Sequence, residues 1–163
     1  MIHILPILQG LLLLVLANGA PVGAKLLLGN RFTTPLDLGM RLADGNPIFG
    51  TSKTIRGIVG AMLVTALAGA MLGIGWKNGA IFGALTMVGD LLSSFTKRRL
   101  GRPPSSRATG IDQIPEAALP LFLCRATLGL TLTDVAVGIA IFLIGEIYIS
   151  RILFRLHLRD RPY

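Results

Sequence analysis

Long apolar runs separated by polar segments dominate the pattern of this chain. Five such runs can be drawn, at residues 4–28, 58–74, 79–95, 114–132 and 135–154. A helix rises about 1.5 Å per residue, so each run can cross a hydrocarbon core of roughly 30 Å once its interfacial ends are included. The runs are too continuous for the strands of a barrel. We expect an all-α, polytopic membrane protein of about five transmembrane helices, forming one membrane domain over residues 1–163.

The composition agrees with this interpretation. Hydrophobic residues make up 52% of the 163 residues and charged residues only 15%, whereas soluble domains average about 25% charged residues. The N-terminus has neither the charged leader nor the small-residue cleavage site of a secretory signal, so residues 4–28 are expected to remain as a span. With a single cysteine, Cys124, the chain has no internal disulfide framework.

The positions of the charges predict the topology. The net charge is +8, and the cations on one side of the predicted spans are Lys25, Arg31, Arg41, Lys53, Arg56, Lys97, Arg98, Arg99, Arg102, Arg107, Arg151, Arg155, Arg159 and Arg161. Lys77 alone lies on the other side, and Arg125 falls within the fourth run. By the positive-inside rule, loops 29–57 and 96–113 and the C-terminus are cytoplasmic, and the N-terminus is outside. Cations placed this way indicate contact with anionic headgroups, including by the tail 151–163, and argue against a nucleic-acid partner.

An acidic residue inside the third run is the first sign of chemistry. If this run is helical, Asp90, Ser93, Ser94 and Lys97 share one face. A carboxylate in a membrane helix costs about 3 kcal/mol by insertion scales, so it normally faces a bundle interior or a wet cavity and marks function. The alternative is a structural latch in which Asp90 pairs with Lys97 or Arg98.

A second carboxylate, Asp112, comes immediately before the fourth run. An Asp at a helix start, followed by Pro115 in the first turn, is typical of an N-cap, and this role is compatible with binding a ligand. Glu116 adds a third carboxylate on the same side, one turn further on. Glu146, in the fifth run, receives no assigned role.

The first long loop carries a possible phosphate site. Residues 45–54 combine two glycines with hydroxyls and Lys53, and Arg56 follows. Exposed amides, hydroxyls and cations together can hold phosphate, so Lys53, Thr54 and Arg56 are candidate binding residues. The spacing does not match a Walker A loop, and contact with anionic lipid is the alternative.

Polar and small residues interrupt the first two runs. Asn18, Gly19 and Pro21 in the first predict either a packing kink or a cavity-lining amide at Asn18. Gly and Ala in the second predict close helix contacts.

Taken together, carboxylates near cations and hydroxyls at one membrane surface predict a site for Mg²⁺ and phosphate. We assign Asp90 and Asp112 as metal ligands, and Asp90, Lys97 and Asp112 as catalytic residues. Lys53, Thr54, Arg56, Ser94 and Arg98 are assigned to nucleotide or phosphate binding. The expected reaction is phosphoryl or nucleotidyl transfer to a lipid. A small transporter and a non-catalytic accessory membrane protein are the alternative functions.

Several motifs resemble one enzyme family. GDLLSSFTKRRLG at 89–101 and IDQ at 111–113, with FGTSKTIRG at 49–57 and ANGAPV at 17–22, resemble the CDP-archaeol synthase family. These membrane cytidylyltransferases are related to the phosphatidate cytidylyltransferases, whose His-Gly-Gly motif is missing here and whose Asp-Arg is replaced by Asp-Gln at 112–113.

The resemblance implies a reaction and its partners. A phosphate oxygen of a lipid phosphate, archaeol-type or related, would attack the α-phosphorus of CTP with Mg²⁺ assistance, giving a CDP-lipid and pyrophosphate. The family's acidic metal positions would correspond to Asp90 and Asp112, and its basic positions to Lys53, Arg56, Lys97 and Arg98.

Overall fold

A computed structural model describes residues 2–103, 106 and 110–155 of the chain, with side chains described as far as Tyr148 in the last helix. The predicted all-α fold is confirmed. Six helices follow one another in the described residues: α1 Ile4–Leu28, α2 Ile55–Met71, α3 Trp76–Arg99, α4 Gln113–Leu123, α5 Arg125–Leu128 and α6 Leu132–Arg155. The predicted contacts of Arg107 and of the tail 151–163 with headgroups concern side chains outside the described residues.

Helix boundaries differ most from the prediction in the fourth apolar run. Residues 114–132 form two helices instead of one, because α4 ends at Cys124 and the single turn of α5 ends at Gly129, whose φ is +70°. Glycine adopts this left-handed conformation without a steric cost. Helices α2, α3 and α6 each begin three residues earlier than their apolar runs. For α2 the start is fixed by the side chain of Thr54, which accepts a hydrogen bond from Gly57 N at 3.3 Å.

Among the described residues, α1 and α3 are long and apolar enough to cross a membrane, and α2 is a shorter apolar helix. The number of spans therefore stays a prediction. Large apolar side chains nevertheless remain on the surface, as at Leu63, Leu67 and Leu27, which are 66%, 65% and 86% exposed. An apolar surface of this kind is what lipid contact requires.

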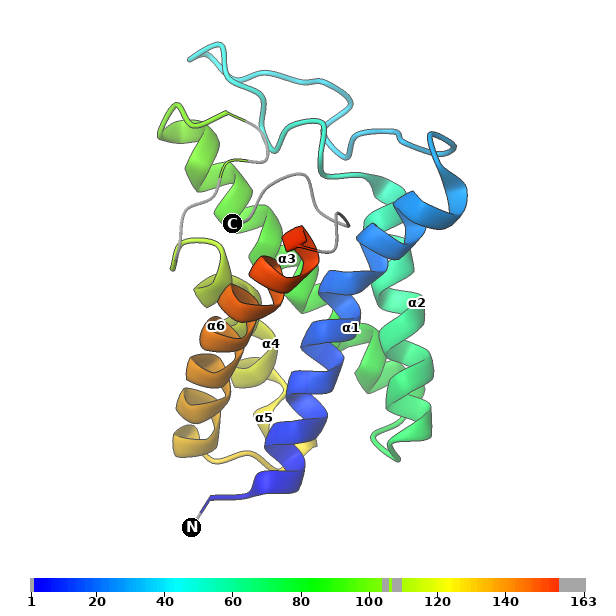
Figure 1. Cartoon of the computed structure of the whole chain (residues 1–163), viewed down its shortest axis with the longest axis vertical. Coiled ribbons are helices and arrows are strands. Elements are labelled where there is room, and N and C mark those ends of the chain that lie inside the picture. Colours follow the sequence, from blue (N-terminus) through cyan, green and yellow to red (C-terminus); the bar gives the residue numbers. More distant parts are fainter. Residues whose placement is uncertain (1, 104–105, 107–109, 156–163) are drawn as a thin grey trace.

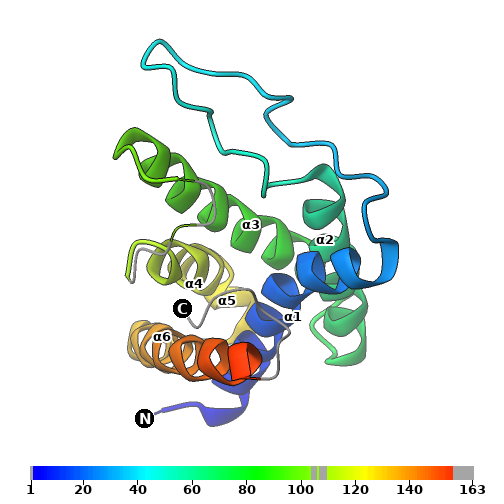
Figure 2. The ribbon, with the colours of Figure 1, turned by 45° about the horizontal axis from the view of Figure 1, so that its top comes forward.

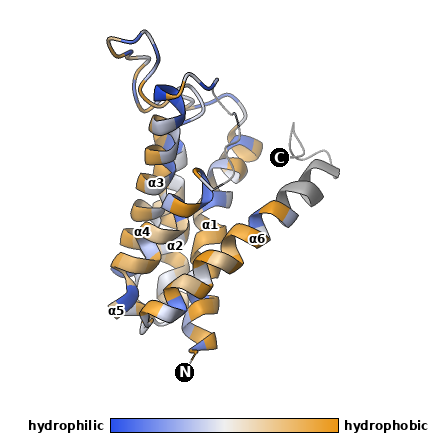
Figure 3. Ribbon diagram, turned by 90° about the vertical axis from the view of Figure 1, so that its left-hand side faces the viewer, coloured by the Kyte–Doolittle hydropathy of each residue, from blue (hydrophilic) through white to orange (hydrophobic). Residues whose placement is uncertain are grey.

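The two ends of the bundle differ in character (Figure 1). The long connection 29–54 and the last turns of α3 lie at one end, here called the loop end, and α6 runs toward it. The N-terminus, the α2–α3 turn and α5 lie at the other end. Turned by 45°, the molecule shows α4 between α3 and α6, with α1 and α2 beside this row (Figure 2). Hydrophobic colouring covers most of the helices, and hydrophilic colouring gathers at the loop end and at α5 (Figure 3).

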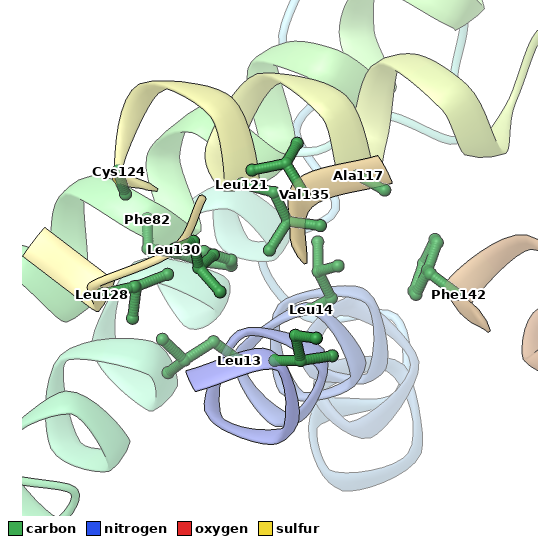
Figure 4. Packing of buried hydrophobic residues seen from close by; sticks show 11 residues of the cluster. Leu13, Leu14, Phe82, Ala117, Leu121, Cys124, Leu128, Leu130, Val135 and Phe142 are labelled. Carbon is green, nitrogen blue, oxygen red and sulfur yellow. The ribbon is translucent and has the colours of Figure 1, made fainter. Parts of the chain in front are cut away.

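The apolar core joins helices that are distant in sequence. Leu13 and Leu14 of α1 are fully buried and point toward Phe82 of α3 and Leu121 of α4 (Figure 4). Helices α2 and α3 touch through small residues, as the sequence predicted. A Cβ on Gly83 would lie 2.1 Å from Thr65 Oγ1, so no larger residue fits there without a shift.

The first long loop is more ordered than its turn-rich sequence predicted. Asp37, which is 3% exposed, accepts hydrogen bonds from Phe49 N and Gly50 N at 2.9 Å and from Gly39 N at 3.1 Å. Burial alone would raise the pKa of Asp37, but these backbone N–H groups outweigh it and hold the pKa below its usual value. Arg99 joins the loop to the end of α3, donating to Asp44 Oδ2 at 2.6 Å. The loop thus holds a defined position over the helix ends.

Candidate functional site

The carboxylate of Asp90 faces the end of the first long loop. Lys53 Nζ donates to both Oδ1 and Oδ2 of Asp90 at 2.6 Å. The two side chains are 22% and 20% exposed, so the pair is partly shielded but remains open to solvent and ligand. Because Lys53 immediately precedes Thr54, the N-cap of α2, the start of that helix fixes where the lysine can reach.

A second acid–lysine pair lies two turns further along α3. Lys97 Nζ is 2.6 Å from Asp112 Oδ1, and it also donates to the carbonyl of Ser106 at 2.9 Å. All four residues predicted to share a face, Asp90, Ser93, Ser94 and Lys97, belong to this helix. The predicted alternative of an Asp90 latch to Lys97 or Arg98 is wrong, because Lys53 occupies Asp90 and Lys97 pairs with Asp112.

Arg98 lies beside the second pair and is 2% exposed. Its guanidinium interacts electrostatically with Asp112, yet its Nε and Nη1 have no hydrogen-bond partner among the described residues. A buried guanidinium normally satisfies its planar set of donors. Arg98 therefore has donor capacity available for an anion.

Glu116 is a carboxylate whose role could not be assigned from the sequence. It is 7% exposed, its carboxyl lies beside that of Asp90, and the charges of Asp90, Glu146 and Lys53 act on it. Only one sequence signal could have indicated this placement. Asp112 and Glu116 are four residues apart, so they point the same way from the start of α4.

Gly89 makes the meeting of Asp90 and Glu116 possible. A Cβ at this position would lie 2.3 Å from Pro115 O and 2.7 Å from Glu116 Cα. Both contacts are with the backbone of α4, which cannot move aside as a flexible side chain can. The glycine therefore sets how closely α3 and α4 approach at the site.

Asn18 and Glu146 lie one helical turn beyond core residues. Leu14 and Phe142 belong to the apolar core, and positions four residues further on face the same way. Asn18 Nδ2 is buried without a hydrogen-bond partner among the described residues. Glu116 and the groups whose charges act on it, Asp90, Glu146 and Lys53, form what we call the polar layer. The cavity-lining role predicted for Asn18 stays a prediction.

The interruption of the first run has a packing role as well. Helix α1 continues through Pro21 without ending, and a Cβ on Gly57 would be 3.3 Å from Pro21 Cβ. The proline therefore packs against the start of α2, as the packing alternative predicted.

The remaining candidates have local contacts. Arg56 Nη1 donates to the carbonyls of Gly29, at 2.8 Å, and Arg31, and so caps the C-terminal end of α1. Thr54 caps α2, and Ser94 is 3% exposed on α3. The described contacts bring Lys53, Asp90 and Glu116 together and Lys97 with Asp112, whereas they tie Arg56 to the end of α1.

The donor set can be tested for its fit to a metal ion. Within the described part of the chain, no three His, Cys, Asp or Glu side chains are grouped closely enough to hold an ion by themselves. Mg²⁺ rarely needs such a group, because one or two carboxylates and the phosphates of a substrate usually complete its oxygen ligands. Asp90 and Asp112, both within reach of solvent and each already facing a cation, suit an ion bound in that way.

Comparison with known proteins gives concordant results. A family model described as CarS-like, CDP-archaeol synthase, matches residues 1–163. A CDP-archaeol synthase of Methanopyrus kandleri is 32% identical over 167 residues, covering 95% of this chain and 92% of that protein. One of Pyrococcus furiosus is 39% identical over 107 residues, and this match covers 60% of each chain.

A solved structure shares the fold. It is described as "Structural insight into an intramembrane enzyme for archaeal membrane lipids biosynthesis", and it matches with a TM-score of 0.70 and 24% identity over 85% of this chain and 91% of that one. The two chains thus share the arrangement of their helices. With the full-length family match, the chain belongs to the CDP-archaeol synthase family.

Proposed function

We propose that this protein is a CDP-archaeol synthase, which joins CTP and archaetidic acid to form CDP-archaeol and pyrophosphate. The observation that carries the proposal is the pairing of acids and cations at the loop end, Asp90 with Lys53 and Asp112 with Lys97. A nucleotide from the aqueous phase and the headgroup of a membrane lipid can both reach this position. Membership of the family supplies the identity of the two substrates.

The membrane arrangement that suits this reaction has five spans within a single domain of residues 1–163. We place both long loops and the C-terminus in the cytoplasm and the N-terminus outside. Two observations support this. The start of α1 lies at the opposite end of the molecule from loop 29–54 (Figure 1), and most cations fall in the two predicted cytoplasmic loops and the C-terminal tail, as the positive-inside rule requires.

Mg²⁺ is the proposed metal, with Asp90 and Asp112 as its protein ligands and Glu116 supporting Asp90. When bound, the ion would neutralise charge on the phosphate oxygens of the nucleotide. Glu116 lies beside Asp90 and would limit the directions in which the Asp90 carboxylate can point.

The lysines have a second use once the nucleotide binds. Lys53 and Lys97 each balance a carboxylate, and each can instead donate to a phosphate oxygen when the carboxylates take a metal ion. Arg98 offers donors without breaking any described hydrogen bond. These cations would bind the triphosphate and stabilise the charge that develops on it during transfer. Thr54, Arg56 and Ser94 remain proposed phosphate-binding residues.

The reaction balances without a redox partner. An oxygen of the lipid phosphate forms a bond to the α-phosphorus of CTP, and the bond from that phosphorus to the oxygen bridging to the β-phosphorus breaks. The electron pair leaves with pyrophosphate. The protein holds the two phosphates together and compensates their mutual repulsion, which is where positioned charges accelerate phosphate chemistry.

The test is product formation by the purified protein in detergent or vesicles. Incubation with CTP, Mg²⁺ and archaetidic acid should give CDP-archaeol, and a diacyl phosphatidic acid measures the preference for the ether lipid. Failure to form a CDP-lipid from either acceptor would retire the proposal.

A further inference from the structure

Asp37 is a buried acid that the proposed reaction does not use. Its side chain is 3% exposed in the first long loop. Oδ2 accepts hydrogen bonds from Phe49 N and Gly50 N, and Oδ1 accepts one from Gly39 N. All three donors are backbone N–H groups of the same loop, and bonds of this kind offset the cost of burying a carboxylate. The described contacts of Asp37 therefore fix the shape of the loop.

The hydrogen bonds of Asp37 continue to Lys53. Gly50 N donates to Asp37 Oδ2 at 2.9 Å, and Gly50 O accepts a hydrogen bond from Lys53 N at 3.1 Å. Lys53 O accepts another from Leu36 N, at 2.7 Å. Both backbone groups of Lys53 are thus bonded within the part of the loop that Asp37 holds together. The side chain of Lys53 ends at Asp90, with Nζ 2.6 Å from each carboxylate oxygen.

The turn from Gly50 to Lys53 is what joins the acid to the lysine. The φ of Gly50 is +95°, a conformation that glycine adopts readily and residues with a Cβ rarely do. On its other side Lys53 is followed by Thr54, the N-cap of α2. A lysine side chain loses much rotamer freedom when its amine is held in one place. A backbone fixed on both sides reduces the directions that the side chain can take.

We propose that Asp37 is a positioning residue for the reaction. It fixes the Gly50–Lys53 turn, and through this turn it places the amine of Lys53 at Asp90 and, once the nucleotide binds, at the triphosphate. The inference rests on the proposed function, which assigns Lys53 to the triphosphate. Asp37 acts through Lys53, because its own oxygens are bonded to amides of the loop.

The first test measures the position of Lys53 without turnover. Asp37→Asn keeps the volume of the side chain but replaces one acceptor oxygen with an NH2 group. Brief treatment with an amine-acetylating reagent, followed by mass spectrometry, should show Lys53 modified several-fold faster in this variant. The rate should approach that in Asp90→Asn, where Lys53 has lost its partner. The exposed Lys25 calibrates the reagent, and Lys97, in the other acid–lysine pair, should keep its rate.

Two outcomes of this test would overturn the proposal. The first is an unchanged acetylation rate of Lys53 in Asp37→Asn. The second is an equal rise at Lys53 and Lys97, because it would show a general loosening of the protein instead of a local displacement of one lysine.

Steady-state kinetics tests whether this position matters for the nucleotide. Asp37→Asn should raise the KM for CTP about fivefold, as expected when one partly exposed contact of a cation is weakened. The KM for archaetidic acid should change by less than about twofold. A loss of folded protein would instead lower the rate and leave both KM values unchanged, so that pattern would contradict the proposal.

A double variant tests whether Asp37 acts through Lys53. Lys53→Met alone should raise the KM for CTP about tenfold, since a charge-assisted hydrogen bond is lost. Adding Asp37→Asn to Lys53→Met should cause no further rise, because the residue through which Asp37 acts is gone. Effects that multiply in the double variant would overturn the proposal.

Asp44→Asn is the matched control in the same loop. Asp44 is bonded to Asn46 and Arg99, away from the Gly50–Lys53 turn. In this variant Arg99 still donates to Pro47 O, at 2.7 Å in the unaltered chain, so the loop remains attached to α3. The acetylation rate of Lys53 and the KM for CTP should stay unchanged. Effects as large as those of Asp37→Asn would contradict the proposal.

Gly50→Ala is a second variant that leaves the carboxylate of Asp37 intact. A Cβ at a φ of +95° strains the turn, so Lys53 should again be acetylated faster. An unchanged rate would argue against the turn as the link between Asp37 and Lys53. If the unaltered protein forms no CDP-lipid, the proposed function fails, whereas the acetylation rates still test how Lys53 is placed at Asp90.

Discussion

Two carboxylates toward opposite ends of the molecule differ in what holds them. Asp134, at the start of α6, is fully buried, and its oxygens accept hydrogen bonds from His3 N, His3 Nδ1, Thr131 N and Thr131 Oγ1 at 2.7 to 3.0 Å. Asp90 is 20% exposed and is held by Lys53, a cation on a loop. The oxygens of Asp134 are therefore fully engaged by hydrogen bonds within the fold. Asp90 keeps a partner, Lys53, that a ligand can replace. This difference separates a carboxylate that stabilises the fold from one that can take part in the reaction.

The largest effect is expected where the acid is proposed to act on substrates. Asp90→Asn keeps the volume and removes the charge, so the rate of CDP-lipid formation should fall by about 100-fold or more, the range seen when one electrostatic catalytic group is removed. The rate of CDP-lipid formation should fall by a similar factor in Asp112→Asn. In Asp90→Asn the unfolding temperature should change little, because Lys53 remains partly exposed. In Asp112→Asn it should fall further, because Lys97 is buried and loses its carboxylate partner. If either variant kept a rate within threefold of the unaltered protein, its carboxylate would not be one that acts on the substrates.

For Asp134, at the end of the molecule opposite Asp90, we expect a loss of stability without a loss of activity. Asp134→Asn leaves buried donors of His3 and Thr131 poorly satisfied, which should destabilise the protein by about 1–3 kcal/mol. Thermal unfolding in detergent measures the loss, and the rate per folded molecule should stay near that of the unaltered protein. If Asp134→Asn abolished activity without loss of stability, the distinction between the two acids would not hold.

Gly89 offers a test of how precisely the polar layer is assembled. Gly89→Ala would force α4 away from α3, since its Cβ meets the backbone of Pro115 and Glu116, and overpacking of this kind costs about 1–3 kcal/mol. Activity should fall together with stability. Gly60→Ala is the matched control, because a Cβ at Gly60 meets nothing within 4 Å, and it should be neutral or slightly stabilising.

A smaller effect, on metal affinity, is expected from removing Lys53, the cation that pairs with Asp90. In Lys53→Met, Asp90 loses the cation that competes with a metal ion, so Mn²⁺ used as a probe should bind up to about fivefold more tightly without nucleotide, as expected for a partly exposed ion pair worth at most about 1 kcal/mol. The electron paramagnetic resonance signal of free Mn²⁺ measures this affinity. Weaker Mn²⁺ binding in Lys53→Met would argue against the exchange of the lysine between carboxylate and phosphate.

The smallest effect concerns how the stability of loop 29–54 depends on pH. Because the pKa of Asp37 lies below its usual 3.8 in the folded protein, its contribution to stability is present above the unfolded pKa and is lost as the pH falls through the lower folded value. Protease cleavage of loop 29–54 should therefore increase only below about pH 4. In Asp37→Asn, cleavage should be faster already at neutral pH and should lose this acid dependence.

Much of the helical architecture could be predicted from the sequence, because hydropathy reports long apolar runs directly. Residues 4–28 coincide with α1. The break at Cys124 could not be seen, since neither Cys124 nor Arg125 is a residue that ends a helix by itself. The order in loop 29–54 was also hidden, because it depends on Asp37 bonding to amides 12 and 13 residues away.

The site was predictable only as far as local periodicity reaches. Spacing alone placed Asp90, Ser93, Ser94 and Lys97 on one helical face, and all four lie on α3. The pairing of Asp90 with Lys53 joins residues 37 positions apart, and the contact with Glu116 depends on how α4 packs at Gly89. Such partners follow from tertiary packing, which no periodicity in the chain encodes.

The most direct test of the central claim follows the phosphorus atoms of CTP through the reaction. The purified protein is given Mg²⁺, archaetidic acid and CTP labelled either at the α- or at the γ-phosphorus. Cytidylyl transfer predicts that the α-label enters the lipid fraction while the γ-label is released as pyrophosphate. Transfer of the γ-label to the lipid, or retention of both labels in the aqueous phase, would contradict the account.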